Sequence, residues 1–237
     1  MKKIVFIAFL VSLGTLLNAQ NLKIAVAAGY KKPVSEVLKA YEAQYGLVDA
    51  MYGNMTQIFA HAKHEDVALV IGDKKFLNKQ KELSFKGYQT LGLGKAVVIY
   101  AKGISLANVE DIASSSVKSV AIPEPKKAIY GDVAIEFLTN AKLYETMKER
   151  LVVVATVPHV ATYVGTHEVD AGVVNLTEAL SLGDKIGGFI EIPSTLYTPI
   201  EIVSGTLDAC LENKACASLG TFFSSSEAKA IFAKYGL

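Results

Sequence analysis

The chain has 237 residues, with 24 lysines and arginines against 23 aspartates and glutamates. This near balance gives no general attraction to nucleic acid or to an anionic membrane surface, so any anion site must be local. The length fits one large domain or two modest lobes.

The first residues, MKKIVFIAFLVSLGTLLNAQ, have a basic start, an apolar stretch over 4–17 and a small residue at Ala19. This layout predicts a secretory signal peptide over residues 1–19 and a periplasmic protein. The apolar stretch is shorter than the ~20 residues that a membrane span needs, although an uncleaved N-terminal anchor stays an alternative.

Strand and helix patterns alternate along the rest of the chain. Strands are expected at 21–29, 47–53, 66–72, 94–103, 116–123, 150–157, 170–175, 188–193 and 197–205. Helices or helical turns are expected at 33–46, 56–64, 74–80, 106–114, 132–150, 159–168, 176–183 and 217–237. LGLGKA, at 91–96, is interpreted as a flexible connection. The alternation predicts an α/β protein with a largely parallel sheet that helices cover on both faces.

The two cysteines, Cys210 and Cys216, lie close together in DACLENKACAS. In an exported protein, such a spacing favours a structural disulfide over two free thiols. Two cysteines alone cannot form a zinc site.

Motifs for catalysis or cofactor binding are missing from the sequence: there is no G-x-S-x-G, no P-loop and no G-x-G-x-x-G. His61 and His64 stand three apart in HAKHED and could begin a metal site, but such pairs on polar helices are more often solvated surface. We therefore predict no enzyme, no metal and no cofactor.

Four expected strands end in small or polar residues just before a helix, in AAGYKKP, YGNMTQI, EPKKAIYGD and TVPHVAT. In an open α/β sheet such ends carry the ligand crevice, and helix N-termini suit anions. The alternative is that these are ordinary turns. Four lysines in them either face solvent or add charge to a cleft: Lys31, Lys32, Lys126 and Lys127.

Several of these stretches resemble the periplasmic molybdate-binding proteins of ABC importers. The resemblance rests on IAVAAG, DVALVIGDKKFLNK, EPKKAIYGDVAIEFLTNAKLYE and the ending EAKAIFAKYGL, and it covers residues 22–237 in order. It implies a two-lobed periplasmic binding protein fold of type II, with a central ligand cleft and two hinge crossings. Lobe one would comprise 20–94 and 199–237, and lobe two 95–198.

The resemblance also implies a ligand shell of backbone amides and hydroxyls, from which this chain departs. Gly29 stands where a serine is expected, the turn at 54–56 replaces a second serine, and Asn175 replaces a tyrosine. The predicted ligand-binding residues are Gly29, Tyr30, Asn54, Met55, Thr56, Ala128, Ile129, Val160 and Asn175.

We therefore predict a monomeric solute-binding protein that captures a tetrahedral oxyanion, molybdate or tungstate, by lobe closure and delivers it to an ABC permease in the inner membrane. The alternatives are the same fold binding another anion or a small organic acid, and a periplasmic enzyme on a similar scaffold. The sequence predicts no nucleic-acid partner.

Overall fold

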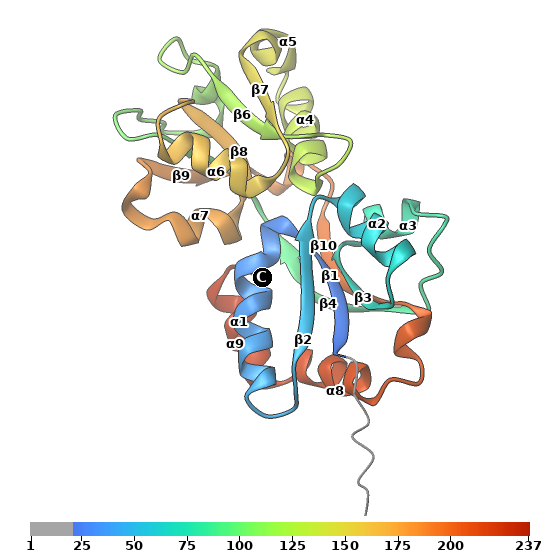
Figure 1. The fold of residues 1–237 in the computed structure, drawn as a ribbon. Coiled ribbons are helices and arrows are strands. Elements are labelled where there is room, and N and C mark those ends of the chain that lie inside the picture. Colours follow the sequence, from blue (N-terminus) through green and yellow to red (C-terminus); the bar gives the residue numbers. More distant parts are fainter. Residues whose placement is uncertain (1–20) are drawn as a thin grey trace, which may run out of the picture.

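The computed structural model describes residues 21–237, which form two α/β lobes stacked one above the other (Figure 1). The predicted signal peptide lies outside the described residues. Each lobe is built on one five-stranded sheet. The strand–helix alternation of the sequence thus divides between two sheets.

Lobe one, the lower lobe in Figure 1, has the strand order β2-β1-β3-β10-β4. Its strands are β1 (Leu22–Ala27), β2 (Val48–Gly53), β3 (Val67–Asp73), β4 (Gly87–Gly94) and β10 (Ile200–Thr206). All seven residues of β3 are buried, as expected of a central strand with helices on both faces.

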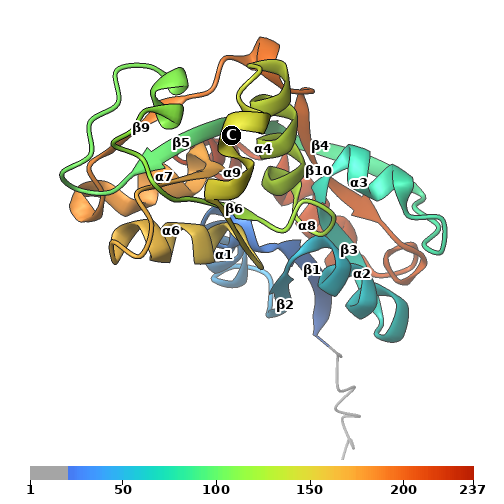
Figure 2. The same ribbon diagram turned by 90° about the horizontal axis from the view of Figure 1, so that it is seen from above.

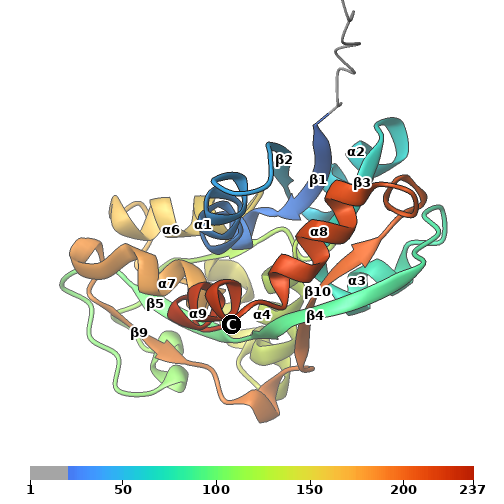
Figure 3. The same ribbon diagram turned by 90° about the horizontal axis from the view of Figure 1, so that it is seen from below.

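Helices cover lobe one on both sides, with α2 and α3 on one face and α1, α8 and α9 on the other, as the view from below shows (Figure 3). The helices are η1 (Ala28–Tyr30), α1 (Lys31–Glu42), α2 (Met55–His64), α3 (Lys74–Lys79), η6 (Asp208–Cys210), α8 (Lys214–Phe223) and α9 (Ser226–Lys234), where η marks a 3-10 helix.

Lobe two has the strand order β7-β6-β8-β5-β9. Its strands are β5 (Ala96–Tyr100), β6 (Val120–Pro123), β7 (Leu151–Val154), β8 (Ala171–Asn175) and β9 (Gly188–Glu191). In the view from above, α4 lies on one face of this sheet and α6 and α7 lie on the other (Figure 2). The helices are η2 (Val109–Ala113), α4 (Ile129–Asn140), α5 (Tyr144–Met147), η3 (Lys148–Arg150), α6 (Val157–Gly165), α7 (Leu176–Leu182), η4 (Gly183–Lys185) and η5 (Ser194–Leu196).

The chain passes between the sheets twice, from β4 to β5 through Lys95 and from β9 back to β10. We keep lobe one at 20–94 with 199–237, and lobe two at 95–198, as the proposed division. Two crossings side by side are the usual geometry of a hinge between lobes.

Both sheets are mixed, so the expectation of a largely parallel sheet was wrong. β10 runs antiparallel to β3 and β4, and β5 runs antiparallel to β8 and β9. β5 and β10 are the strands that follow the two crossings, so neither is joined to its own sheet by a βαβ unit, which is the connection that makes neighbouring strands parallel.

The stretch interpreted as a flexible connection is part of strand β4. Its glycines let other parts of the chain pack closely against the strand. A Cβ on Gly92 would meet the backbone of Leu237, and one on Gly94 would overlap the hydroxyls of two tyrosines. Periodicity gave no strand signal here because those glycines take the places of side chains.

The helix predicted over 132–150 begins earlier and ends sooner, at Ile129 and Asn140. Lys142 adopts φ 60°, and Leu143 donates its amide hydrogen to the Leu138 carbonyl at 2.8 Å. This is the hydrogen-bond pattern of a Schellman cap, usually made with glycine. Because a lysine occupies the cap position, the sequence carried no visible stop signal.

The predicted disulfide is present. Cys210 and Cys216 are bonded, with their Cα atoms 5.4 Å apart, and the bond joins η6 to the first turn of α8. It anchors the last two helices to the end of β10.

Candidate functional site

A small cavity lies between the two lobes, where four strands end and four helices begin. It is lined by the turns after β1 and β2 of lobe one and by those after β6 and β7 of lobe two. The lining residues are Ala27, Ala28, Gly29, Tyr30, Gly53, Asn54, Met55, Ala128, Ile129, Tyr130, Thr156 and Val157. None of these side chains carries a formal charge.

The cavity is small. The centre of a water molecule can occupy ≈ 20 Å³ of it. If this space is treated as a sphere, adding the ~1.4 Å radius of water gives a hollow of about 3 Å radius. With the lobes placed as they are here, a ligand of a few heavy atoms fits this space and a larger one does not.

Three helices that begin at the cavity have no side-chain cap. α4 begins after Ala128, α6 after Thr156 and η1 after Ala27, and none of these residues accepts a hydrogen bond from the first turn of its helix. The hydroxyl of Thr156 makes no hydrogen bond to any residue in the described range 21–237. Uncapped helix starts leave backbone N–H donors and a partial positive charge at the cavity.

Backbone amides of both lobes are therefore available to a ligand. Within residues 21–237, the N–H groups of Ile129 and Tyr130 have no acceptor. Gly29 and Val157 lie in the first turns of η1 and α6, where an amide has no acceptor in its own helix. A cluster of N–H donors without nearby cationic side chains is suited to a small anion.

The turn after β2 is built differently. Asn54 caps α2 by accepting from the amide of Gln57, whose side chain accepts in turn from the Asn54 amide at 2.9 Å. The Met55 amide, the first of α2, donates across the cleft to the Lys127 carbonyl at 2.7 Å. The amides of Asn54, Met55 and Gln57 are thus already used by the protein. The Thr56 amide has no acceptor within residues 21–237, and it belongs to a residue outside the cavity lining.

Two buried tyrosines meet behind the cavity, one from each lobe. The hydroxyls of Tyr30 and Tyr130 are 2.6 Å apart, and both side chains are 1% exposed. Burial raises the pKa of both phenols well above the usual value, so both stay protonated at neutral pH. The pair therefore holds one hydrogen bond between the lobes.

Asn175, predicted as a ligand residue, does not line the cavity. It is fully buried at the end of β8, where its side-chain oxygen caps α7 by accepting from the Glu178 amide. Its amide nitrogen donates to the Gly29 carbonyl at 2.7 Å. A side chain at position 29 would press on this amide, since a Cβ there would lie 3.2 Å from the nitrogen.

The structure brings most of the remaining predicted residues together, and two stand apart. Gly29, Tyr30, Asn54, Met55, Ala128 and Ile129 line the cavity, whereas Thr56 is exposed and outside it. The Val160 amide donates to the Thr156 carbonyl within the first turn of α6, and Val157 takes its place at the cavity. Thr156 and Tyr130 were missed, although a threonine two residues before Pro158 is a helix-start signal.

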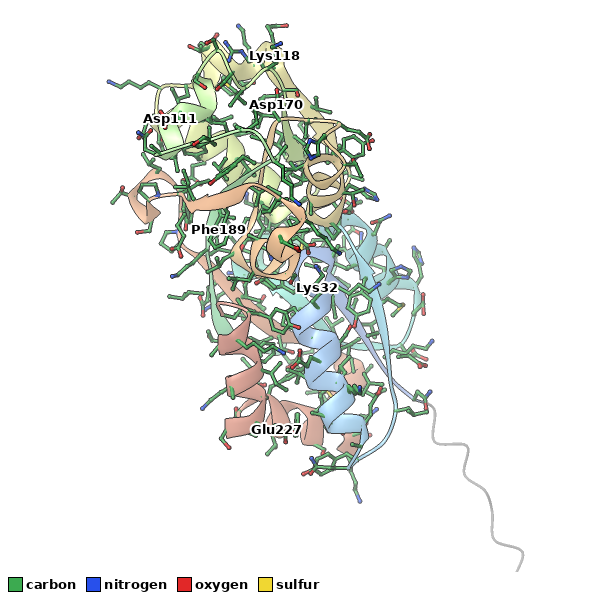
Figure 4. All side chains as sticks on the ribbon, turned by 90° about the vertical axis from the view of Figure 1, so that its left-hand side faces the viewer. Lys32, Asp111, Lys118, Asp170, Phe189 and Glu227 are labelled. Atoms are coloured by element: carbon green, nitrogen blue, oxygen red, sulfur yellow. A yellow bond between two sulfur atoms is a disulfide. The ribbon has the colours of Figure 1, made fainter. Side chains whose placement is uncertain are left out.

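The four lysines of the turns are exposed and do not line the cavity. Lys32 pairs with the largely buried Glu178 of lobe two at 2.8 Å, and Figure 4 shows it at the junction of the lobes. Lys31 lies over the ring of Tyr52. These contacts place lysine charge at the cleft rim, away from the cavity.

Within residues 21–237, no group of three or more histidine, cysteine, aspartate or glutamate side chains is placed to hold a metal ion. His61, considered for a metal site, pairs with Glu65 at 2.9 Å. Within the same residues, no helix has the length and apolarity needed to cross a membrane.

Comparisons with known proteins agree with this geometry. The model of the family described as "Bacterial extracellular solute-binding protein" matches residues 22–237. The molybdate-binding protein ModA of Rhodobacter capsulatus is 25% identical over 219 residues, which cover 90% of this chain and 86% of the relative.

Two solved structures share the fold. The periplasmic molybdate-binding protein of Azotobacter vinelandii has a TM-score of 0.82 at 21% identity, over 91% of this chain and 98% of that one. PEB3 bound to L-phospholactate has a TM-score of 0.73 at 18% identity, again over 91% of this chain and 98% of that one.

The family match spans both sheets, both crossings and every turn that lines the cavity. Members of this family are binding components of transporters and not enzymes, which agrees with a cleft that offers hydrogen-bond donors and no catalytic group. The chain belongs to the bacterial extracellular solute-binding proteins and is a solute-binding protein of the ABC-transporter type.

Proposed function

We propose that the protein captures a tetrahedral oxyanion, molybdate or tungstate, in the periplasm and delivers it as a monomer to an ABC permease in the inner membrane. The observation that carries the proposal is the cavity, an uncharged hollow of oxyanion size at which uncapped helices of both lobes begin. The proposed ligand groups are the amides of Gly29, Ile129, Tyr130 and Val157 and the hydroxyl of Thr156.

The size of the cavity supports an oxyanion. A tetrahedral ion with bonds of roughly 1.8 Å to oxygens of ~1.4 Å radius has a radius of about 3 Å, close to that of the hollow. Sulfate and phosphate are slightly smaller tetrahedral ions that also fit a hollow of this size, so the size supports the oxyanion class and titration discriminates among its members.

The kind of polar group also supports a fully deprotonated ion. The proposed groups are four N–H donors and one hydroxyl, and no carboxylate lines the cavity. Hydrogen phosphate carries a proton that needs an acceptor, and the Thr156 hydroxyl is the one proposed ligand group that could accept it, at the cost of the hydrogen bond that this hydroxyl would otherwise donate to the anion. Molybdate and tungstate carry no proton at neutral pH and avoid this penalty.

Helix dipoles balance the negative charge of the bound anion. The N-termini of α4 and α6 approach the cavity from lobe two, and each carries roughly half a positive charge, while η1 presents its first amides from lobe one. A dianion between such ends is stabilised without any salt bridge. The long-range field of the protein is near neutral and contributes little.

Calorimetry tests the proposal. The mature protein is titrated with molybdate, tungstate, sulfate and phosphate in separate experiments, and we expect the first two to bind at least 100-fold more tightly than phosphate. The assignment fails if none of the four binds more tightly than high micromolar.

A second candidate, a small phosphorylated organic acid, is favoured by the structural likeness to PEB3, whose structure contains L-phospholactate. The volume of the cavity argues against it in the closed arrangement. Native mass spectrometry of protein purified without added ligand distinguishes the two, because a retained organic acid and a retained metal oxyanion differ in mass and isotope pattern.

A further inference from the structure

Two side-chain hydrogen bonds join the lobes directly beside the cavity. The Asn175 amide nitrogen donates to the Gly29 carbonyl at 2.7 Å. A short distance away, the Tyr30 and Tyr130 hydroxyls bond to each other at 2.6 Å. Polar side chains at the cleft thus form hydrogen bonds from one lobe to the other.

The Tyr30–Tyr130 contact is buried and the Asn175–Gly29 contact is partly buried, so water competes little with the first and only in part with the second. Asn175 is 0% exposed, and the two tyrosines are 1% exposed. Opening the cleft would separate these hydrogen-bond partners and expose each of them to water. Closing the cleft pairs them with each other as it shields them from water. Buried, fully paired polar groups of this kind favour one well-defined arrangement.

Gly94, the last residue of β4, lies beneath the tyrosine pair. A Cβ there would overlap the Tyr130 hydroxyl and would lie 2.7 Å from that of Tyr30. The position is at the first crossing between the lobes. Only glycine leaves the space that the two hydroxyls fill when the lobes meet.

We propose that the Tyr30–Tyr130 hydroxyl pair over Gly94, together with the Asn175–Gly29 bond, is a latch that holds the cleft closed before solute binds. The closed state is then substantially populated in ligand-free protein. Solute can enter only when the cleft opens transiently. Because the closed state is already populated without solute, less of the binding free energy is needed to close the lobes, and the affinity for the solute is higher. The latch rests on the proposed function only in that the cleft is the solute site, and it acts whichever solute binds.

The Met55 amide provides a direct probe of closure. It donates to the Lys127 carbonyl of the other lobe at 2.7 Å. As the first residue of α2, it has no acceptor within its own helix. Its hydrogen exchange is therefore slow when the lobes are closed and fast when they part. The Ile71 amide in the central strand β3 reports global unfolding for comparison.

The test measures exchange at these two amides by NMR in mature protein that elemental analysis shows to be free of molybdenum, tungsten and phosphorus and that ion chromatography shows to be free of sulfate. We expect the wild-type Met55 amide to be protected. Tyr130→Phe removes one hydroxyl, and Asn175→Ser keeps an oxygen to cap α7 but cannot reach Gly29. Each variant should speed hydrogen exchange of the Met55 amide roughly 2- to 10-fold. Exchange of the Ile71 amide should change only as much as the free energy of global unfolding changes.

Gly94→Ala should speed Met55 exchange more than either variant, because the added methyl displaces the hydroxyl pair. In Gly94→Ala/Tyr130→Phe the increase should be smaller than the product of the single effects, since one overlapping hydroxyl is gone. An unprotected Met55 amide in the wild type, or variants that leave its exchange unchanged, would overturn the latch. Because no ligand is present, failure of molybdate to bind does not affect this result.

Discussion

The longer helices that begin at the cavity differ from those that begin elsewhere in how their first amides are treated. Away from the cavity, α8 and α9 are capped by the side chains of Asn213 and Ser225, and the shorter α3 is capped by Asp73. Elsewhere in residues 21–237, α1 continues directly from η1, and the short segments α5 and η3 to η6 also begin without a side-chain cap. At the cavity, η1, α4 and α6 have no side-chain cap. A missing cap typically costs about 1 kcal/mol of stability, and the uncapped ends meet where a ligand is expected.

Among the longer helices, with η1 counted as the start of α1, the missing caps therefore share one location, the cavity. An uncapped helix end leaves donors that must find another partner, and three such ends share one hollow. α2 is the informative exception, since it begins at the cavity but is capped by Asn54. Within this comparison, α2 should contribute shape to the site, and α4 and α6 should contribute binding energy.

The largest expected effect comes from adding a cap at the cavity. In Ala128→Asp, the new carboxylate would accept from the first amides of α4 and place negative charge beside the bound anion. We expect the affinity for molybdate to fall at least 100-fold by calorimetry. Ala128→Asn supplies a similar cap without charge and should lose less. Equal losses in the two variants would mean that bulk, and not occupied amides and charge, is responsible.

A smaller effect is expected from the uncommitted hydroxyl of Thr156. Thr156→Val keeps the shape and removes the hydroxyl, so the affinity for the anion should fall roughly 10- to 100-fold. The free energy of unfolding without ligand should hardly change, because this hydroxyl caps nothing. Thr156→Ser should retain the affinity. A drop in ligand-free stability in urea unfolding, with affinity intact, would show that the hydroxyl serves the fold instead.

The smallest expected effect on binding is at the capped helix of the cavity. Asn54→Ala removes the capping box of α2 and should lower the free energy of unfolding by about 1 kcal/mol, while affinity changes less than about 3-fold. Ser225→Ala, at the N-terminus of α9, is the matched control with a similar stability loss and unchanged binding. A tenfold loss of affinity in Asn54→Ala alone would make Asn54 a ligand residue.

Much of the site was predictable because strand ends and helix starts are local features. The turns around Gly29, Met55, Ala128 and Ile129 were located from small residues that follow apolar strands, and the structure brings them to one cavity. The structure places Val157 at the cavity instead of Val160, whose amide donates to the Thr156 carbonyl, because the first amide of a helix is left without an acceptor and the fourth is not.

Asn175 could not be understood from its own neighbourhood in the sequence. Locally it is an N-cap of α7, and that role is readable from its position before a helix. Its bond to Gly29 joins residues 146 positions apart, across two lobes. The same holds for Tyr30 and Tyr130, whose hydroxyls meet only when the lobes do.

The sequence by itself determined the alternation of strands and helices, the disulfide spacing and the turns that can bind an anion, because each depends on residues within a few positions of one another. Tertiary structure decided the mixed sheets, the close fit of Gly94 under two tyrosines, and which donors stay free. These depend on how far-apart segments pack, since a hydrogen-bond donor is available to a ligand only if no other part of the folded chain has already taken it.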